Sequence, residues 1–351
     1  MYYVNENIKD LYRVKFHDER TNVLRLDMNE NPEGLPRELF DTVMSKITPE
    51  YIATYPEKDH LMTLLAEENG IAYQNISVTA GSDEAMRLIF HCFGERGKKL
   101  LTVTPTFEMY GVYAEMFGLR HETVKYKEDF SIDSKDILKS IDSNTRIIIL
   151  LNPNSPIGYT YDEEEVREII EQARKVGAIV VIDEAYHYFY APTFMPLINE
   201  YDNLLVLRTF SKLFSMAGLR IGYVSGNTGL IGYIEKAEST FNVNNIAIMF
   251  AKEVIQNHEL INQLAEIEHE GRLWIAEKLK NAGYKTMMLE GNYILFLPKR
   301  DSRKIVEDLK EKKVWVRDYR TGVLKGWIRV STGSVACMEK FWETFAQIDS
   351  K

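Results

Sequence analysis

Short apolar runs separated by polar turns dominate the first part of the chain. The runs at 147–151, 179–182 and 204–207 are continuously apolar, and shorter ones lie at 76–79 and 100–103. Continuous apolar runs of this length are typical of strands buried on both faces of a parallel sheet. Helical segments lie between the strand candidates, and such alternation predicts an α/β fold.

The segment 162–176 is the clearest of these helices. Asp162 stands where an N-cap is expected, with Glu165 three positions later, which is the spacing of a capping box. Gly177 follows the last helical position and can end the helix in the left-handed conformation. We therefore interpret the acidic start of the segment as capping and dipole complementarity, not as a metal site.

The pattern changes after about residue 246. A long helical stretch comes first, at 260–279. Short strand candidates follow it at 293–297, 314–316 and 327–330. This order predicts a smaller α+β domain. No linker rich in glycine, proline or serine separates the two parts, so we expect them to pack tightly. We assign 30–245 to a large domain, and 1–29 together with 246–351 to a small domain.

Composition and charge narrow the possible functions. The 351 residues are enough for two domains, and the apolar fraction of 45% is ordinary for a soluble protein. The net charge of −9 argues against nucleic acid as a partner. No apolar stretch approaches the roughly 20 residues that a membrane helix needs. Cys92 and Cys337 show neither metal spacing nor disulfide density, and the N-terminus lacks a signal-peptide pattern. These features predict a cytoplasmic protein without membrane partners.

Lys212 is the most informative candidate for chemistry. It closely follows the apolar run 204–207, with hydroxyl groups around it and Arg220 eight positions later. Burial lowers the pKa of an amine, and a neutral amine can form a Schiff base with an aldehyde. Hydroxyls and an arginine suit a phosphate. An aldehyde and a phosphate on one small molecule describe pyridoxal 5'-phosphate (PLP). The alternative is a surface loop with ordinary charges.

Polar groups follow the other predicted strands as well. In open α/β sheets, ligands bind at the carboxyl ends of the strands. Gly81 and Ser82 open a helix whose amides could hold a phosphate, although a plain N-cap would look the same. Phe107 could stack on a flat ring or belong to the core. The loop at 152–158 offers amide and hydroxyl groups, or is simply a rigid turn.

Asp183 and Tyr186 complete this set. A carboxylate directly after a buried run needs a partner, and a pyridinium nitrogen is such a partner. Tyr186, three residues on, could reach a phenolate oxygen of the same ring, whereas Asp183 could also cap a helix. Together, the groups at five strand ends are those that one PLP molecule would need.

On these motifs the chain resembles the fold-type I PLP enzymes, and among them the class I/II aminotransferases. It is most similar to the histidinol-phosphate aminotransferase family. The resemblance spans nearly the whole chain and is carried by segments 29–32, 55–56, 81–84, 105–110, 152–158, 183–186, 208–212, 217–220, 241–244, 292–295, 316–318 and 329–333. It implies a large domain with a mainly parallel seven-stranded sheet flanked by helices, and a smaller α+β domain.

The resemblance also implies roles for individual residues. Lys212 would form the Schiff base with PLP and move protons, Asp183 would pair with the pyridinium nitrogen, and Tyr186 would bond the ring 3-oxygen. The remaining cofactor-binding residues would be Gly81, Ser82, Asp83, Phe107, Asn154, Ser155, Thr209, Ser211 and Arg220, with Tyr55 reaching the cofactor of the neighbouring subunit. The substrate-binding residues would be Asn29, Tyr12, Arg317 and Arg329. A homodimer is therefore implied.

The sequence departs from the family pattern at Ser155 and Ile157. The family usually has asparagine and threonine at these places, and the asparagine bonds the ring 3-oxygen. A serine is shorter and reaches that oxygen only through water. Neither change removes Lys212 or Asp183, so we expect the chemistry to survive while cofactor tuning and substrate choice change.

Our leading hypothesis is transamination between an amino donor and a 2-oxo acid acceptor, with histidinol phosphate and 2-oxoglutarate as the pair, in histidine biosynthesis. A phospho-amino-acid decarboxylase, or an aromatic or other amino-acid aminotransferase, would carry the same PLP-binding residues. A PLP-binding regulator without catalysis would need a DNA-binding module, for which the segment before Asn29 is too short. The histidines, such as His91 and His187, show no metal-ligand spacing, so no metal is expected.

Overall fold

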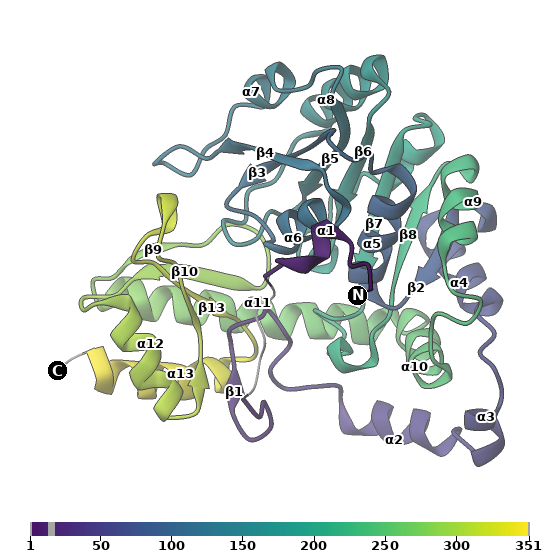
Figure 1. Cartoon of the computed structure of the whole chain (residues 1–351). Coiled ribbons are helices and arrows are strands. Elements are labelled where there is room, and N and C mark those ends of the chain that lie inside the picture. The colour runs from purple at the N-terminus through teal and green to yellow at the C-terminus, as the bar shows by residue number, and fades with distance from the viewer. Residues whose placement is uncertain (1, 13–17, 350–351) are drawn as a thin grey trace.

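A seven-stranded sheet forms the centre of the computed structural model, which describes residues 2–12 and 18–349 (Figure 1). The strand order is β2-β8-β7-β6-β5-β3-β4, in which β8 runs antiparallel to both neighbours and all other pairs are parallel. The strands are β2 (Ile76–Thr79), β3 (Lys99–Thr104), β4 (Arg120–Lys125), β5 (Thr145–Leu151), β6 (Ile179–Asp183), β7 (Leu204–Thr209) and β8 (Gly222–Gly226). The predicted α/β class and mainly parallel seven-stranded sheet are confirmed.

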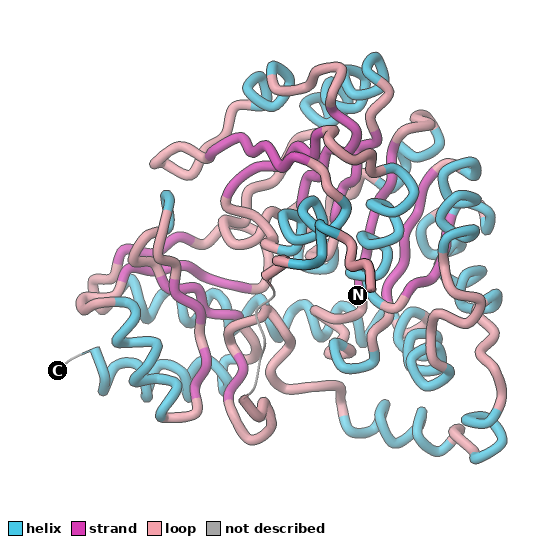
Figure 2. The backbone as a smooth tube through the Cα atoms, viewed as in Figure 1, coloured by secondary structure: helices cyan, strands magenta, loops and turns pink. Residues whose placement is uncertain are grey.

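Both faces of this sheet are buried, as the apolar runs predict. Along β5, Ile148 and Leu150 belong to one apolar core cluster, whereas Ile147 and Ile149 belong to another. Successive side chains of a strand point to opposite faces, so a continuous apolar run supplies both clusters. Figure 2 shows helices on both sides of the strands. These helices include α4 (Asp59–Asn69), α5 (Gly81–Phe93), α6 (Met109–Phe117), α7 (Ser134–Lys139), α8 (Glu163–Val176), α9 (Thr228–Ala237) and α10 (Asn245–Ile255).

Helix α8 has the ends that its sequence predicts. The Asp162 side chain accepts a hydrogen bond of 2.8 Å from the Glu165 backbone amide, and the Glu165 side chain accepts one of 3.2 Å from the Asp162 amide. Gly177 ends the helix with a φ of 74°. The reciprocal bonds satisfy amides that have no partner inside the helix. The interpretation of the acidic start as a capping box is confirmed.

The second part of the chain builds a four-stranded antiparallel sheet in the order β12-β13-β10-β9. Beside it, β1 pairs in parallel with β11, so that Leu24 lies opposite Val314. Three helices carry most of the remaining core. The elements are β1 (Leu24–Arg25), β9 (Lys285–Met287), β10 (Tyr293–Leu297), β11 (Val314–Trp315), β12 (Arg317–Asp318), β13 (Ile328–Ser331), α11 (His258–Asn281), α12 (Ser302–Glu311) and α13 (Val335–Asp349).

Helix α11 joins the two parts, and Figure 1 shows it running from the small sheet to below the seven-stranded part. Leu260 and Leu264 in its first half pack in a core cluster of the seven-stranded part, and Ile275 and Leu279 in its second half pack with the small sheet. Helix α10 also packs in the former cluster. The change from one core cluster to the other therefore falls inside α11. The division into two domains remains a prediction.

The three N-terminal helices lie against the large part. Helix α1 (Glu6–Lys9) lies beside α6, where a Cβ atom on Gly118 would be 2.7 Å from the Asn7 side-chain nitrogen. Helices α2 (Arg37–Ser45) and α3 (Pro49–Ala53) follow the segment that crosses from β1 to the large part. Among the described helices, none is both long and apolar enough to cross a membrane.

Candidate active site

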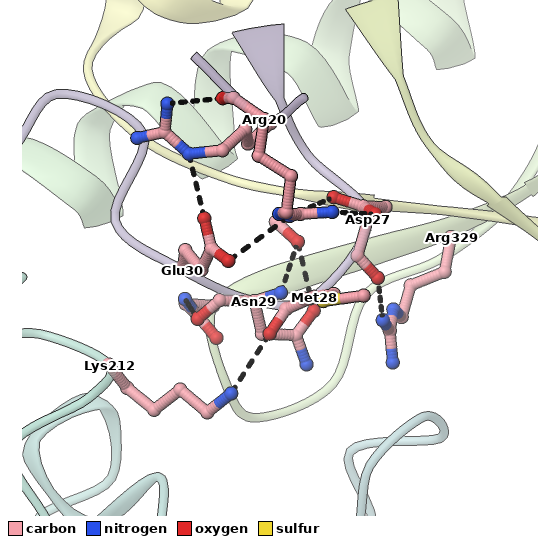
Figure 3. Close-up of polar contacts among 10 residues, drawn as sticks. Arg20, Asp27, Met28, Asn29, Glu30, Lys212 and Arg329 are labelled. Carbon is pink, nitrogen blue, oxygen red and sulfur yellow. Dashed lines mark hydrogen bonds and ion pairs between the residues drawn. The ribbon is translucent and has the colours of Figure 1, made fainter. Parts of the chain in front are cut away.

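Lys212 lies in the loop after β7, at the carboxyl end of the sheet. Its Nζ donates a hydrogen bond of 2.9 Å to the Met28 carbonyl oxygen, as Figure 3 shows. The same nitrogen lies 5.8 Å from the centre of the Tyr186 ring. The loop after β7 and the segment before α2 therefore meet here, although the two hydrogen-bonded residues are far apart in sequence. The amine is half-buried and is held by a neutral oxygen.

Asp183 ends β6 and is 4% exposed. Its Oδ2 accepts a hydrogen bond of 2.8 Å from the Tyr110 hydroxyl, and its Oδ1 accepts one of 3.1 Å from the Ala185 amide. Burial raises the pKa of Asp183 to about 6, against the opposing effects of these hydrogen bonds and of the Lys212 charge. A buried carboxylate with a raised pKa gains stability from a cation brought beside it. The site therefore suits a protonated ring nitrogen such as that of PLP.

Tyr186, Asn29 and Ser155 are brought into direct contact. The Asn29 side-chain nitrogen donates to the Tyr186 hydroxyl oxygen at 2.8 Å and lies 3.3 Å from the Ser155 hydroxyl oxygen. All three residues are buried, with Asn29 only 1% exposed. The structure therefore brings together three predicted site residues that are far apart in the sequence.

Arg329 on β13 adds a buried cation to this group. Its Nη1 donates a hydrogen bond of 3.2 Å to the Ser155 hydroxyl, and its Nη2 donates to the Asp27 carbonyl oxygen (Figure 3). Within the described residues its Nε has no hydrogen-bond partner, and the side chain forms no ion pair. A buried guanidinium with a free donor favours an anionic ligand. Arg317 differs, because its Nη2 is bound to Glu108 Oε1 at 2.6 Å.

Arg220 lies against the start of α5. Gly81 has a φ of 80°, and a Cβ atom there would lie 2.8 Å from Arg220 Nη2. Glycine at this position therefore allows a guanidinium to approach the first amides of a helix, which have no side-chain cap. Ser82 belongs to this first turn, and Thr209 donates to the Ser211 hydroxyl at 2.9 Å. The donor set fits a phosphate.

Three further residues predicted to bind the cofactor make contacts with neighbouring side chains and loops. Asp83 accepts a hydrogen bond of 2.8 Å from the Tyr113 hydroxyl. Asn154 accepts one of 2.7 Å from Thr106 and donates one of 2.9 Å to the Pro105 carbonyl, so its amide joins two loops. Phe107 is partly exposed and meets the Tyr110 ring edge-on, with 5.5 Å between the ring centres.

Tyr55 and Tyr12 project from the surface. Tyr55 is 74% exposed and stacks on Phe241 with 4.3 Å between the ring centres. Tyr12 is 77% exposed. The next residues, 13–17, lie outside the described part of the chain.

Sequence reasoning gave no role to Tyr110, Ser331 or Met28. Ser331 stands two positions after Arg329 on β13, and strand alternation places the two side chains on one face. That spacing was a usable signal. Tyr110 follows Phe107 closely, but nothing in the spacing shows that its hydroxyl reaches Asp183. Met28 acts through its backbone oxygen, which no side-chain pattern can reveal.

The profile of the family described as "Aminotransferase class I and II" matches residues 21–345. A histidinol-phosphate aminotransferase of Thermoanaerobacter sp. is 32% identical over 94% of this chain and 94% of its own length. One of Pyrococcus furiosus is 32% identical over 91% of this chain and 88% of its own.

Solved structures share the fold. Histidinol-phosphate aminotransferase of Clostridium acetobutylicum has a TM-score of 0.84 at 22% identity, covering 93% of this chain and 99% of its own. That of Sinorhizobium meliloti, in complex with pyridoxal-5'-phosphate, has a TM-score of 0.82 at 22% identity and covers 92% and 91%. In the described residues, no group of three histidine, cysteine, aspartate or glutamate side chains is arranged to hold a metal. The chain belongs to the class I and II aminotransferase family and is a PLP-dependent aminotransferase.

Proposed function

We propose that this aminotransferase transfers the amino group of histidinol phosphate to 2-oxoglutarate, as a step of histidine biosynthesis. The names of its relatives at 32% identity support this substrate pair. The structural observation that carries it is Arg329, a buried guanidinium with a free Nε beside Ser155. Both proposed substrates bring an anionic group, a phosphate or a carboxylate, which a guanidinium binds through paired hydrogen bonds.

The cofactor site rests on residues whose positions fit PLP. Bound PLP supplies an aldehyde for the substrate amine and a ring that withdraws electrons from the reacting carbon. Lys212 would hold the cofactor through Nζ, and a free Nζ would accept and return a proton. Asp183 would keep the ring nitrogen protonated, and Tyr186 would donate a hydrogen bond to the ring oxygen.

The phosphate of PLP would be held at the start of α5. Arg220 brings a positive charge to the helix amides at Gly81 and Ser82, and Thr209 and Ser211 add hydroxyl groups. Asp83, Phe107, Asn154 and Ser155 complete the proposed cofactor contacts, with Phe107 covering the ring. The exposed face of Phe107 supports that role, because a ring buried in the core could not stack on a ligand.

Substrate binding would centre on Arg329. Arg317 is already paired with Glu108, so its charge is partly neutralised and we propose that it plays the smaller part. Asn29 would line the pocket beside the reacting groups, and Tyr12 would belong to a segment near its entrance.

We propose that the protein is a cytoplasmic homodimer in which Tyr55 reaches the cofactor of the neighbouring subunit. The exposed stack of Tyr55 on Phe241 supports a surface that a second copy covers, as do the exposed apolar residues Phe40, Met44 and Ile52. Sedimentation of the wild type and of an Ile52→Asp variant tests this assembly. A wild type that sediments as a monomer at working concentration would contradict it.

The test of the reaction is direct. Purified protein with PLP, histidinol phosphate and 2-oxoglutarate should release glutamate, and each substrate omitted in turn should abolish it. Parallel reactions contain aromatic amino acids as donors, or a phospho-amino acid with detection of carbon dioxide. If glutamate formed only with aromatic donors, the protein would be an aromatic amino-acid aminotransferase instead. Carbon dioxide without glutamate would assign a decarboxylase instead.

A further inference from the structure

We propose that Asn29 is a positioning residue that sets the direction of the Tyr186 hydroxyl proton, so that this proton points toward the bound cofactor. The inference rests on the PLP site described above and goes beyond it. Asn29 and Ser331 would together orient the Tyr186 hydroxyl, which is the hydrogen-bond donor to the cofactor.

The orientation of the Asn29 amide follows from Ser331. The Asn29 backbone amide donates to the Ser331 hydroxyl oxygen at 2.8 Å, and this hydroxyl donates its own hydrogen to Asn29 Oδ1 at 2.9 Å. Ser331 is fully buried. If the Asn29 amide were reversed, the Ser331 hydrogen would have no acceptor among the described residues, and a buried unpaired donor is costly. The Asn29 side-chain nitrogen therefore faces Tyr186.

The backbone of Asn29 is held as firmly as its side chain. Its φ is 56°, in the left-handed region that asparagine and aspartate tolerate better than most residues. Its carbonyl oxygen accepts a hydrogen bond of 3.1 Å from the Asn292 side chain, and Asn292 is 1% exposed. Figure 3 shows Asn29 beside Met28, whose carbonyl binds Lys212. The Asn29 side-chain amide is therefore held in a fixed position near Lys212.

The consequence concerns the single proton of the Tyr186 hydroxyl. Its oxygen accepts the Asn29 hydrogen bond of 2.8 Å, so its own hydrogen must serve another acceptor. The described part of the chain supplies no acceptor for it, and Lys212 Nζ lies on the ring side at 5.8 Å from the ring centre. An oxygen of bound PLP would be that acceptor. A donor at that oxygen stabilises its anionic form and lowers the pKa of the bound cofactor.

The first test is a spectral pH titration of the PLP-loaded protein without substrates. Asn29→Asp keeps the size and the left-handed backbone, but its carboxylate accepts the Tyr186 proton and turns it away. We expect the apparent pKa of the cofactor absorbance to rise by about one unit, the size of one lost hydrogen bond. Because the new charge also acts directly, the substitution is repeated in a Tyr186→Phe background. There the shift should fall to less than half.

The second test avoids the charge. Ser331→Ala removes the acceptor and donor that orient the Asn29 amide, and it should raise the same apparent pKa by a smaller amount. Ser225→Ala is the matched control, because Ser225 is a fully buried strand serine whose hydroxyl has no partner among the described residues. The proposal would be overturned if Asn29→Asp shifted the apparent pKa equally in the wild-type and Tyr186→Phe backgrounds. It would also be overturned if Ser331→Ala gave the same titration as Ser225→Ala. Failure of the PLP assignment would differ, since the wild type itself would then show no Lys212-dependent absorbance.

Discussion

Lys212 and Met28 are joined by a hydrogen bond of 2.9 Å from the Lys212 amine to the Met28 carbonyl oxygen. Met28 lies between Asp27, whose carbonyl binds Arg329, and Asn29, whose amide binds Tyr186. One short segment thus contacts the nucleophile, the buried cation and the ring hydroxyl. Figure 3 shows how Arg20 holds this segment from outside, through hydrogen bonds of 2.9 Å to Asp27 and 3.1 Å to Glu30.

Replacing Lys212 by alanine should abolish the covalent attachment of PLP and lower turnover by about 10²- to 10⁴-fold or more, because the proton-transfer group is lost. The absorbance of the loaded protein and the rate of glutamate formation measure the two effects. Lys139→Ala serves as the control, since Lys139 is an exposed helix lysine paired only with Asp136. Normal turnover of the Lys212 variant would refute its central role.

The cofactor-free protein should lose stability as Asp183 ionises. Its pKa is about 6 in the folded state against 3.8 for an ordinary aspartate, so the folded state binds more protons between these values. The free energy of unfolding therefore falls as pH rises from about 4 to about 6, by up to about 3 kcal/mol relative to Asp183→Asn. Urea unfolding of both proteins across this range measures the difference. A difference that does not change with pH would contradict a pKa of Asp183 that burial raises.

Arg329→Lys should weaken both half-reactions together. A lysine keeps the charge but loses the planar fork, and each lost hydrogen bond to a charged group is worth about 1.5–3 kcal/mol. We expect kcat/KM for the amino donor and for the 2-oxo acid to fall by about 10- to 100-fold, with PLP affinity nearly unchanged. Arg317→Lys, at the site paired with Glu108, should have a smaller effect. An effect on only one substrate would show that the anion of the other substrate binds elsewhere.

Glu184, the residue after Asp183, belongs to a buried ion pair with Arg208. Arg208 Nε lies 2.9 Å from Glu184 Oε2, and these side chains are 4% and 1% exposed. Arg208→Met would leave a buried unpaired carboxylate and should lower the free energy of unfolding by about 3–5 kcal/mol. Adding Glu184→Gln should recover part of this loss, and chemical unfolding of the single and double variants measures it. Equal stability of the Arg208→Met variant and the wild type would contradict this account.

Much of the architecture could be predicted because it depends on local patterns. The runs at 147–151 and 179–182 indicated strands buried on both faces, and β5 and β6 confirm this through their two core clusters. The Asp162–Glu165 pair indicated a capped helix start because capping involves residues three positions apart. The place of Lys212 after β7 followed from the same logic, since parallel strands end at one edge of a sheet.

The sequence by itself determined which residue types stand at the strand ends, and thereby the cofactor class. Only the tertiary structure decided how they are oriented. Ser331 meets Asn29 from 302 positions away, and Tyr110 reaches Asp183 from 73 away. The sequence also did not reveal that the two halves of α11 pack in different core clusters. Hydrogen-bond direction and long-range packing depend on how whole elements are placed in space, whereas strand burial and helix capping depend on neighbours along the chain.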